Sequence, residues 1–203
     1  MTIANSTSTD DLGSAAQRDR RKRILDATYE LATAGGFDAV QMRAVAEQAD
    51  VALGTLYRYF PSKIHLLVSA LGRQFEETAV RLNEREIPGD TQADRVLYVL
   101  KRMARGMQGD PKLTEALTRA FMFADSSVAN EIHVVGMSMT SIVTHAMHGG
   151  VPAEGSITDE DVAVARVLGD VWLSALVAWV TGRSTAAETA AHMDTAIHLI
   201  LRD

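Results

Sequence analysis

The fold is decided by residues 53–63, which read LGTLYRYFPSK. Residues 53–59 predict a short helix that Pro61 brings to an end. Just before them, residues 42–49 predict another short helix, and the turn Asp50-Val51-Ala52 separates the two. Two short helices joined by a tight turn have the dimensions of a helix-turn-helix.

Apolar side chains on both short helices predict a small core that fixes the helices at an angle. With that face buried, the second helix is left exposed as a probe for the major groove of DNA. Thr55, Tyr57 and Arg58 then project outward, where hydroxyl groups and a guanidinium can reach phosphates or base edges. Taken one at a time the aromatic residues are equally well explained as core, but their combined spacing favours DNA reading. The predicted core residues are Val45, Ala46, Ala49, Val51, Leu56 and Phe60.

Further positions around this pair of helices are candidates for contact with the DNA backbone. Gly54 lets the main chain approach a phosphate, and the N-terminus of a helix favours that anion. Lys63 begins the next helix and Arg43 lies on the preceding one, and both are placed for phosphates. The candidate DNA-binding residues are therefore Arg18, Arg20, Arg43, Leu53, Gly54, Thr55, Tyr57, Arg58, Tyr59 and Lys63.

The charge distribution separates a cationic part of the chain from an acidic one. The formal net charge of the whole chain is -6, which is unusual for a protein that binds nucleic acid. Residues 14–75, however, carry nine lysine and arginine residues against six aspartate and glutamate residues. This asymmetry suggests a small cationic module that faces a polyanion and a larger acidic part that does not touch it.

The N-terminal region predicts a tail followed by a basic helix. Residues 1–13 have little to bury and are expected to be disordered. Residues 16–34 have apolar positions at helical spacing, and Gly35-Gly36 supplies a left-handed stop. A bare run of positive charge is usually solvated surface, but immediately ahead of a helix-turn-helix a minor-groove or phosphate contact is the better interpretation. The run consists of Arg18, Arg20, Arg21, Lys22 and Arg23.

Beyond the helix-turn-helix every signal is helical. Ser62 can cap a long helix, and the chain shows neither the alternation typical of strands nor an internal repeat. We therefore predict an all-α fold of about nine helices, with a helix-turn-helix domain at residues 14–62 and a larger helical domain at residues 63–203. The helices predicted after Ser62 span residues 63–85, 91–107, 112–124, 127–148, 158–181 and 185–201.

The stretch from Gly36 to Lys63 resembles the N-terminal signature of TetR-family regulators, and the similarity runs without gaps from residue 20 to residue 71. Its most specific part is GTLYRYF at residues 54–60, followed by Ser62-Lys63. The resemblance implies a homodimeric repressor. Its helix-turn-helix would bind a palindromic double-stranded DNA operator, and its larger domain would bind a small hydrophobic inducer.

Two positions depart from the family pattern. Asp50 stands where the family commonly carries glycine, and Val40-Gln41 stands where the second helix commonly begins with threonine or serine. Aspartate is among the few residues besides glycine that tolerate a left-handed turn. The missing hydroxyl removes one expected phosphate contact, so no contact is assigned to Gln41.

The apolar residues of segment 158–181 cover more than one face of the predicted helix, so one side must be covered by something beyond its own domain. A two-fold partner is the economical choice, and a wholly intramolecular core is the alternative. Together with the last helix, this segment would form the four-helix dimer interface that the resemblance implies. Such a dimer presents two recognition helices about 34 Å apart, one turn of DNA. The candidate interface residues are Leu168, Val171, Ala175, Trp179, Met193 and Ile197.

The resemblance also implies a ligand pocket among the middle helices. Methionine is flexible and polarizable, which suits a large apolar ligand, although each candidate taken singly is more simply explained as core. The candidate ligand-binding residues are Met103, Met107, Leu113, Leu117, Phe121, Met122, Met137, Trp172 and Leu176.

A narrower resemblance is to the KstR-type repressors of sterol catabolism in actinobacteria. It rests on RRKRILDA at residues 20–27, on residues 52–71, on LTEA at 113–116 and on DVWLS at 170–174. It implies a sterol-derived CoA thioester as inducer, with phosphates that would meet Lys101, Arg102 or Arg105. A different hydrophobic or acyl-CoA ligand, and an architectural DNA-binding protein without a ligand, are the alternatives.

An enzyme is not expected, because the sequence contains neither a Gly-rich phosphate loop nor a nucleophile elbow. With no cysteine, disulfides, thiolate metal sites and Cys nucleophiles are excluded. His145 and His148, with Glu131 or His133, are a conceivable metal site, but partly exposed helix histidines are the better interpretation. We expect no cofactor and no metal. Without a secretion signal or a bilayer-length apolar run, we expect a cytoplasmic protein with no membrane partner.

Overall fold

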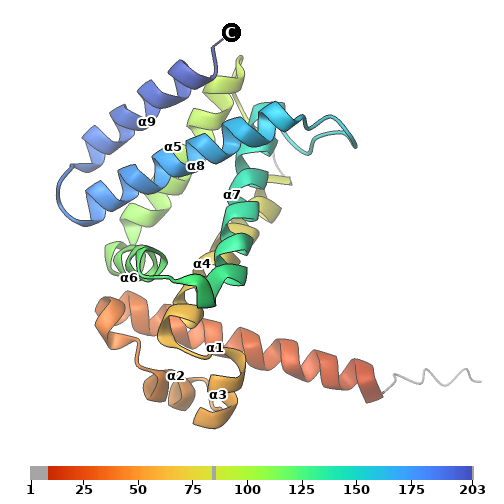
Figure 1. Ribbon diagram of the computed structural model, residues 1–203, viewed down its shortest axis with the longest axis vertical. Helices are drawn as coiled ribbons and strands as arrows, with labels where there is room; N and C mark the ends of the chain where they lie inside the picture. Colours follow the sequence, from red (N-terminus) through yellow and green to blue (C-terminus); the bar gives the residue numbers. More distant parts are fainter. Residues whose placement is uncertain (1–8, 84–85, 203) are drawn as a thin grey trace, which may run out of the picture.

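The computed structural model describes residues 9–83 and 86–202, with side chains from residue 15 onward. Over these residues the chain forms nine α helices, one 3-10 turn and no strand, which confirms the predicted all-α class. The first three helices form a small head at one end, and α4 rises from it into a larger helical body (Figure 1). The α helices are α1 (Thr9–Ala39), α2 (Met42–Gln48), α3 (Leu53–Tyr59), α4 (Lys63–Asn83), α5 (Gln92–Gly109), α6 (Pro111–Met122), α7 (Ala129–His148), α8 (Asp159–Val180) and α9 (Ala186–Ile200), and the 3-10 turn η1 spans Ser126–Val128.

The long helix α1 begins inside the segment that we expected to be a disordered tail. Residues 1–8 of that segment lie outside the described residues, whereas the helix begins at Thr9, so residues 9–13 are helical. The predicted left-handed stop is confirmed at Gly36, which has φ 69° and interrupts the helical dihedral angles. The chain can turn there because glycine has no Cβ to clash in this region.

The turn between α2 and α3 is built as the sequence predicts. Asp50 has a φ of 51°, the only positive value at a non-glycine residue among those described. Arg23 of α1 closes this turn from the side, since its guanidinium donates to the carbonyl oxygen of Ala49 at 2.8 Å and to that of Asp50 at 3.3 Å. Gln41 at the start of α2 makes no capping hydrogen bond with its side chain, as its departure from the usual hydroxyl residue implied.

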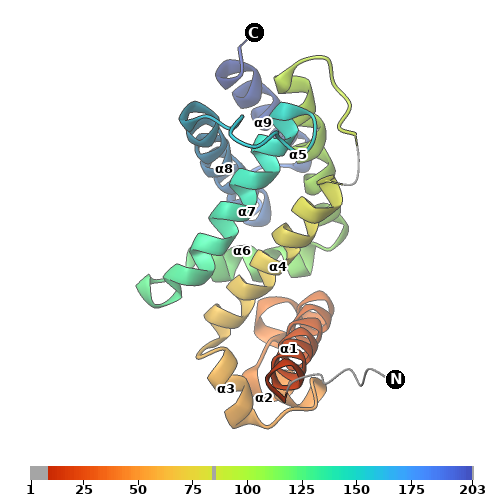
Figure 2. The ribbon, with the colours of Figure 1, turned by 90° about the vertical axis from the view of Figure 1, so that its right-hand side faces the viewer.

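The helix α4 belongs to two cores at once. Its first half packs on α1 and carries the buried residues Leu66 and Leu67, while farther along Phe75 and Leu82 are buried in the larger body. Two contacts hold it to α1: Tyr29 donates its hydroxyl hydrogen to the carbonyl oxygen of Ala70, and Arg73 pairs with Asp26. In the turned view, α7 lies alongside α4 through the body (Figure 2).

The starts of the later helices follow from their capping residues. Asp110 accepts a hydrogen bond from the amide of Leu113 ahead of Pro111, as the cap-then-proline pattern predicted. Thr91, Thr158 and Thr185 each form a capping box with the acidic residue three positions on. The acidic cluster that opens α8 is therefore explained by its cap and by the helix dipole.

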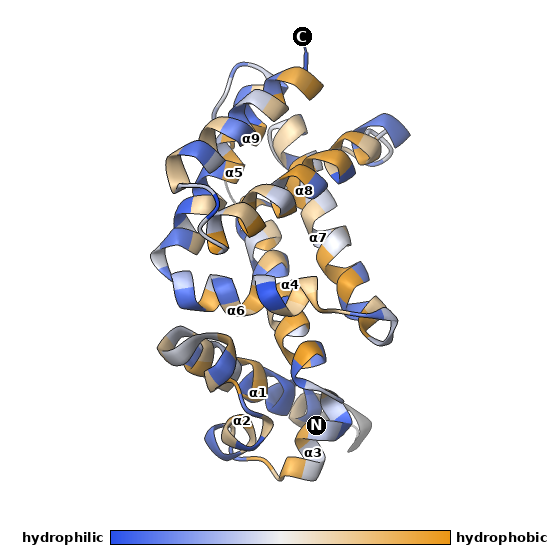
Figure 3. Cartoon of the chain, turned by 60° about the vertical axis from the view of Figure 1, so that its left-hand side comes forward, coloured by the Kyte–Doolittle hydropathy of each residue, from blue (hydrophilic) through white to orange (hydrophobic). Residues whose placement is uncertain are grey.

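The helix α8 is apolar around most of its circumference but only partly covered by the chain (Figure 3). Among the described residues it is the one helix long and apolar enough to span a membrane by length and composition, yet only 22% of its most apolar window is buried. It packs on α6, α7 and α9, while Val167 on its outer face is 49% exposed. The fold therefore leaves one apolar stripe of α8 without a partner inside the chain.

The left-handed turn at Asp50 generates the first prediction. Replacing Asp50 with Val should lower the free energy of unfolding by about 1–2 kcal/mol, because a β-branched residue is strained at this φ. Asp50→Gly is the matched control and should change the free energy of unfolding by less than about 0.5 kcal/mol. The Arg23–Asp50 ion pair that it removes is 4.0 Å long and exposed, so it contributes little. Urea denaturation of both variants measures the difference, and equal stabilities would show that this backbone conformation is not retained in solution.

Candidate DNA-binding and ligand-binding sites

The helix α3 presents a polar face on a small buried core. Leu56 and Phe60 are 0% and 2% exposed, whereas Tyr57 is 46% exposed and Arg58 is also exposed. Leu53, Thr55 and Tyr59 are half-buried at the edges of the helix. The predicted core is buried apart from Val51, which is half-buried against it.

Gly54 and Arg43 complete this exposed surface. A Cβ built on Gly54 would have no heavy atom within 4 Å, so nothing inside the chain requires glycine there. Arg43 on α2 is exposed, and neither it nor Arg58 forms an ion pair with any residue that the structure describes. These two cations are therefore available to an external anion.

The basic run on α1 is divided between internal contacts and the surface. Arg23 closes the α2–α3 turn, Lys22 pairs with Asp26 at 3.0 Å, and the guanidinium of Arg21 lies 5.6 Å from the centre of the Phe60 ring. Arg18 is exposed and Arg20 is half-buried. Part of the charge that suggested DNA contact is thus used to hold the helix-turn-helix together.

Lys63 faces the joint between the head and the body, which differs from the expected phosphate contact. Its Nζ lies 3.8 Å from the centre of the Phe37 ring, and the guanidinium of Arg119 on α6 lies 4.4 Å from that centre. Burial in this joint is the main cause that lowers the pKa of Lys63. In this arrangement the Lys63 ammonium group makes a cation–π contact with the Phe37 ring. Lys63 therefore reaches a phosphate only if it leaves Phe37.

The same joint ties α1 to α6 by polar contacts. The Phe37 amide donates to the Glu115 carboxylate at 3.4 Å, and Lys112 Nζ donates to the carbonyl oxygen of Ala34 at 2.8 Å. Thr33 donates its hydroxyl hydrogen to Asp110. The head is therefore attached to the body through α6 as well as through α4.

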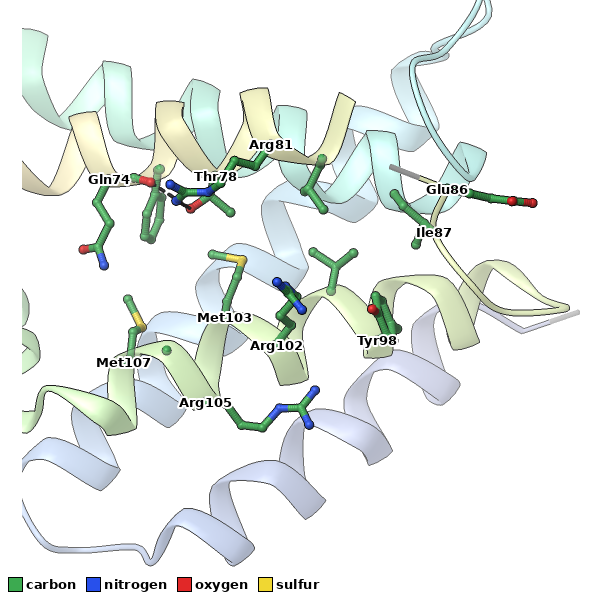
Figure 4. Close-up of a pocket in the computed structure, with 14 residues that line it drawn as sticks. Gln74, Thr78, Arg81, Glu86, Ile87, Tyr98, Arg102, Met103, Arg105 and Met107 are labelled. Carbon is green, nitrogen blue, oxygen red and sulfur yellow. Dashed lines mark hydrogen bonds between the residues drawn. The ribbon is translucent and has the colours of Figure 1, made fainter. Parts of the chain in front are cut away.

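A first cavity of about 580 Å³ lies between α4 and α5 (Figure 4). Met103 and Met107 line it, as predicted, and so do three arginines, Arg81, Arg102 and Arg105. Arg102 and Arg105 form no ion pair with a described residue, whereas neighbouring Lys101 donates to Asp194 on α9 at 3.1 Å. Of the three proposed phosphate-binding residues, Arg102 and Arg105 therefore border the cavity, and Lys101 does not.

A second cavity of about 300 Å³, open to solvent on one side, is lined by α4, α6, α7 and α8. Three of the predicted residues, Phe121, Trp172 and Leu176, contribute to its walls. The Nε1 atom of Trp172 is buried without a hydrogen-bond partner. The cavity is otherwise mainly apolar, and its wall includes Leu71, Phe75, Val135 and Leu173, which the sequence-based prediction did not include.

The remaining predicted ligand-binding residues line neither cavity. Leu117 is 2% exposed and belongs to the core, and Leu113 is half-buried against that core. Met122 and Met137 are 51% and 54% exposed and lie on the surface. Helical periodicity identified these residues as apolar but did not show which of them border empty space.

Most of the predicted dimer-interface residues face the core of their own chain, and the interface itself stays a prediction. Leu168, Ala175, Met193 and Ile197 are at most 6% exposed in the single chain. Trp179 is half-buried and borders a small cavity with Ala104 and Met107 of α5.

Of the predicted set, only Val171 lies partly on the outer face of α8, near Val167. On α9, the outward apolar residue is Leu199, which is 56% exposed. The uncovered apolar stripe of the body is therefore shifted by about one residue along α8 from the set that we predicted.

One of the two histidines near the end of α7 contacts the start of α8. His148 Nε2 lies 3.4 Å from an Asp161 carboxylate oxygen, and the Nδ1 atom of His145 is buried without a hydrogen-bond partner. Burial, and then the neighbouring His148, lower the pKa of His145. Within residues 9–83 and 86–202 no group of three or more His, Cys, Asp or Glu side chains could hold a metal ion.

Two family descriptions match the chain in succession. Residues 24–70 match "Bacterial regulatory proteins, tetR family", and residues 89–200 match "Tetracyclin repressor-like, C-terminal domain". The first match covers α2, α3 and much of α1, and the second covers the body from α5 to α9.

Two similar relatives carry the name "HTH-type transcriptional repressor KstR". The one from Rhodococcus jostii is 55% identical over 96% of this chain and 88% of its own. The one from Mycolicibacterium smegmatis is 51% identical over 99% of this chain and 96% of its own.

Two solved structures have similar architecture. A TetR transcriptional regulator from Rhodococcus sp. RHA1 superposes with a TM-score of 0.81 at 33% identity, over 92% of this chain and 97% of that one. FadR from Thermus thermophilus, described as a complex with lauroyl-CoA, superposes with a TM-score of 0.66 at 18% identity, over 89% of this chain and 93% of that one. The second likeness concerns the fold alone.

Proposed function

The chain belongs to the TetR family of bacterial transcriptional regulators, and we propose that it represses transcription by binding a palindromic operator until an amphipathic ligand releases it. One observation carries this proposal. The exposed side chains Tyr57 and Arg58 stand on a buried helix-turn-helix core, in a chain that matches named repressors over nearly its whole length. As a DNA-binding regulator, it would act in the cytoplasm.

The DNA-reading surface is the outer face of α3 with the cations beside it. Tyr57 and Arg58 are exposed at its centre, and a guanidinium can donate two hydrogen bonds to one guanine edge. Arg43 and Arg18 lie on the neighbouring helices, where positive charge favours phosphates. The acidic body stays away from the duplex and so limits binding to this end of the molecule.

A homodimer would form through the uncovered stripe on α8 and α9. Val167, Val171 and Leu199 contribute apolar surface there, and Ser174 and Ala191 are small enough for close helix approach. A two-fold axis through this stripe would place both heads on the same side of the dimer. The two α3 helices could then enter successive major grooves about 34 Å apart.

The ligand would occupy the cavities of the body. The first cavity combines methionines with Arg102 and Arg105, and the second is mainly apolar, so together they suit a ligand with an apolar body and an anionic tail. A CoA thioester has this character. The resemblance to KstR-type repressors favours a sterol-derived acyl group and genes of lipid or sterol catabolism as targets.

A mobility-shift titration tests the whole proposal. The protein is mixed with DNA from upstream of its own gene, with and without a panel of sterol-CoA and acyl-CoA compounds. Specific binding that a CoA thioester relieves supports the proposal. Specific binding that no compound alters would instead favour an architectural role without a ligand.

Removing a reading side chain should abolish operator specificity. Arg58→Ala should weaken operator binding by about 1–3 kcal/mol while leaving binding to unrelated DNA much less affected, because base contacts carry the specificity. Tyr57→Ala should also reduce specific binding. Fluorescence anisotropy measures both, and Arg183→Ala in the α8–α9 loop is the control for loss of one exposed arginine. Unchanged specificity in both reading-helix variants would exclude α3 as the recognition helix.

Placing a charge on the outer face of α8 should prevent dimer formation. Val167→Asp puts a carboxylate into the apolar stripe, and an unpaired charge buried there would cost several kcal/mol. Analytical ultracentrifugation should then show a monomer. Val80→Asp is a matched control, since Val80 is 58% exposed but lies on α4. A variant dimer as tight as the native one would place the interface elsewhere.

Removing the cations of the first cavity should weaken binding of CoA thioesters selectively. Arg102→Ala and Arg105→Ala should each lower affinity about tenfold, which corresponds to the loss of one charge-assisted contact. Lys101→Ala removes the same charge from the same helix but from a side chain paired with Asp194, so it should have a smaller effect. Isothermal titration calorimetry compares the three variants, and tighter binding of a free sterol than of its CoA ester would contradict the proposed ligand.

A further inference from the structure

The two large cavities share one wall residue. Phe75 lines both the cavity between α4 and α5 and the cavity lined by α4, α6, α7 and α8. Its side chain is 5% exposed, so it is held inside the body. No other described residue is common to the walls of these two cavities.

The two cavities differ in chemistry. Arginines line the first cavity, and two of them, Arg102 and Arg105, form no ion pair with a described residue. The wall of the second includes Leu71, Val135 and Met139 and is mainly apolar. An anionic tail is therefore suited to the first cavity and an apolar body to the second.

We propose that Phe75 is a partition between these two parts of one ligand site, and that only a ligand whose apolar body displaces Phe75 releases DNA. This inference rests on the proposed function and identifies the residue that separates binding from release. The tail is held at Arg102 and Arg105. Passage of the body into the second cavity requires the Phe75 ring to move.

Because Phe75 lies on α4, its displacement would be transmitted along that helix to the head. Two residues earlier, Arg73 pairs with Asp26 of α1, and the carbonyl oxygen of Ala70 accepts the hydrogen bond from Tyr29. The same helix begins at Lys63, just beyond the recognition helix. Because packed interiors shift between discrete arrangements, a ring pushed aside at Phe75 moves α4 against α1.

The two parts of the site therefore have different roles. A CoA thioester with a short acyl group fills only the first cavity, binds, and leaves Phe75 in place. A thioester with a bulky apolar body fills both cavities and releases the operator. A ligand shifts an equilibrium only through its differential affinity for the two states, so the short compound should act as a competitor without releasing DNA.

The experiment compares lithocholoyl-CoA, which carries a sterol ring system, with pentanoyl-CoA, which carries a similar length of side chain without rings. Calorimetry on the whole protein measures binding of each compound, and anisotropy with upstream DNA measures operator affinity at saturation. Lithocholoyl-CoA should lower operator affinity at least tenfold, and pentanoyl-CoA less than threefold. Excess pentanoyl-CoA should also reverse the effect of lithocholoyl-CoA.

Two variants test the partition itself. Phe75→Leu keeps an apolar side chain and should bind lithocholoyl-CoA at least as tightly as the native protein, while the loss of operator affinity falls to less than threefold. Phe75→Trp enlarges the partition and should weaken binding of lithocholoyl-CoA at least tenfold more than binding of pentanoyl-CoA. Phe123→Ala is the control, because Phe123 is 66% exposed and lines neither cavity.

The outcomes separate this inference from the proposed function. Release of DNA by both compounds, or full release in Phe75→Leu, would overturn the partition while leaving a CoA-responsive repressor intact. An unchanged affinity of Phe75→Trp for lithocholoyl-CoA would show that the sterol enters the second cavity by its own rim, near Arg166 and Asp170, and would also overturn it. Failure of both compounds to bind the native protein would overturn the proposed ligand and the inference together.

Discussion

The attachment of α4 to α1 constrains everything else in this molecule. The head is too small to fix its own orientation, and it relies on a helix whose other half is buried in a different core. Arg73 with Asp26, and Tyr29 with the Ala70 carbonyl, determine the angle at which that helix leaves the head. Burial raises the pKa of Tyr29, so its hydroxyl keeps its proton and remains a donor at any physiological pH. The orientation of α3 is thus a property of the whole chain.

The second attachment, around Phe37, makes the joint stiff. Lys63 and Arg119 both lie close to the Phe37 ring, and Glu115 accepts from the Phe37 amide. Two cations near one ring repel each other, and nearby carboxylates offset that repulsion. A body that changes shape can therefore act on the head through α4 and α6 together. The arrangement also explains why Lys63, which the sequence predicts to contact a DNA phosphate, is directed inward.

The sequence was sufficient for the features that depend on local chemistry. Gly36 and Asp50 were identified because few residues accept a positive φ, and the end of α3 was placed correctly because Pro61 stops the helix. The residues selected for the interface are mostly buried in their own chain, since periodicity shows that α8 is apolar all round but not which side its own chain covers. Leu168 illustrates this, being 0% exposed. Phe75 was missed because a cavity is a property of several helices at once and leaves no pattern in any one of them.

The uncovered stripe of α8 has a consequence for how the protein behaves when it is scarce. A chain that hides part of its apolar surface only by pairing gains folding free energy from its partner, so its resistance to unfolding rises with its own abundance. Dilute molecules would melt at lower temperature and be degraded sooner than concentrated ones. The cellular concentration of the protein would then also determine how long each molecule lasts before it is degraded.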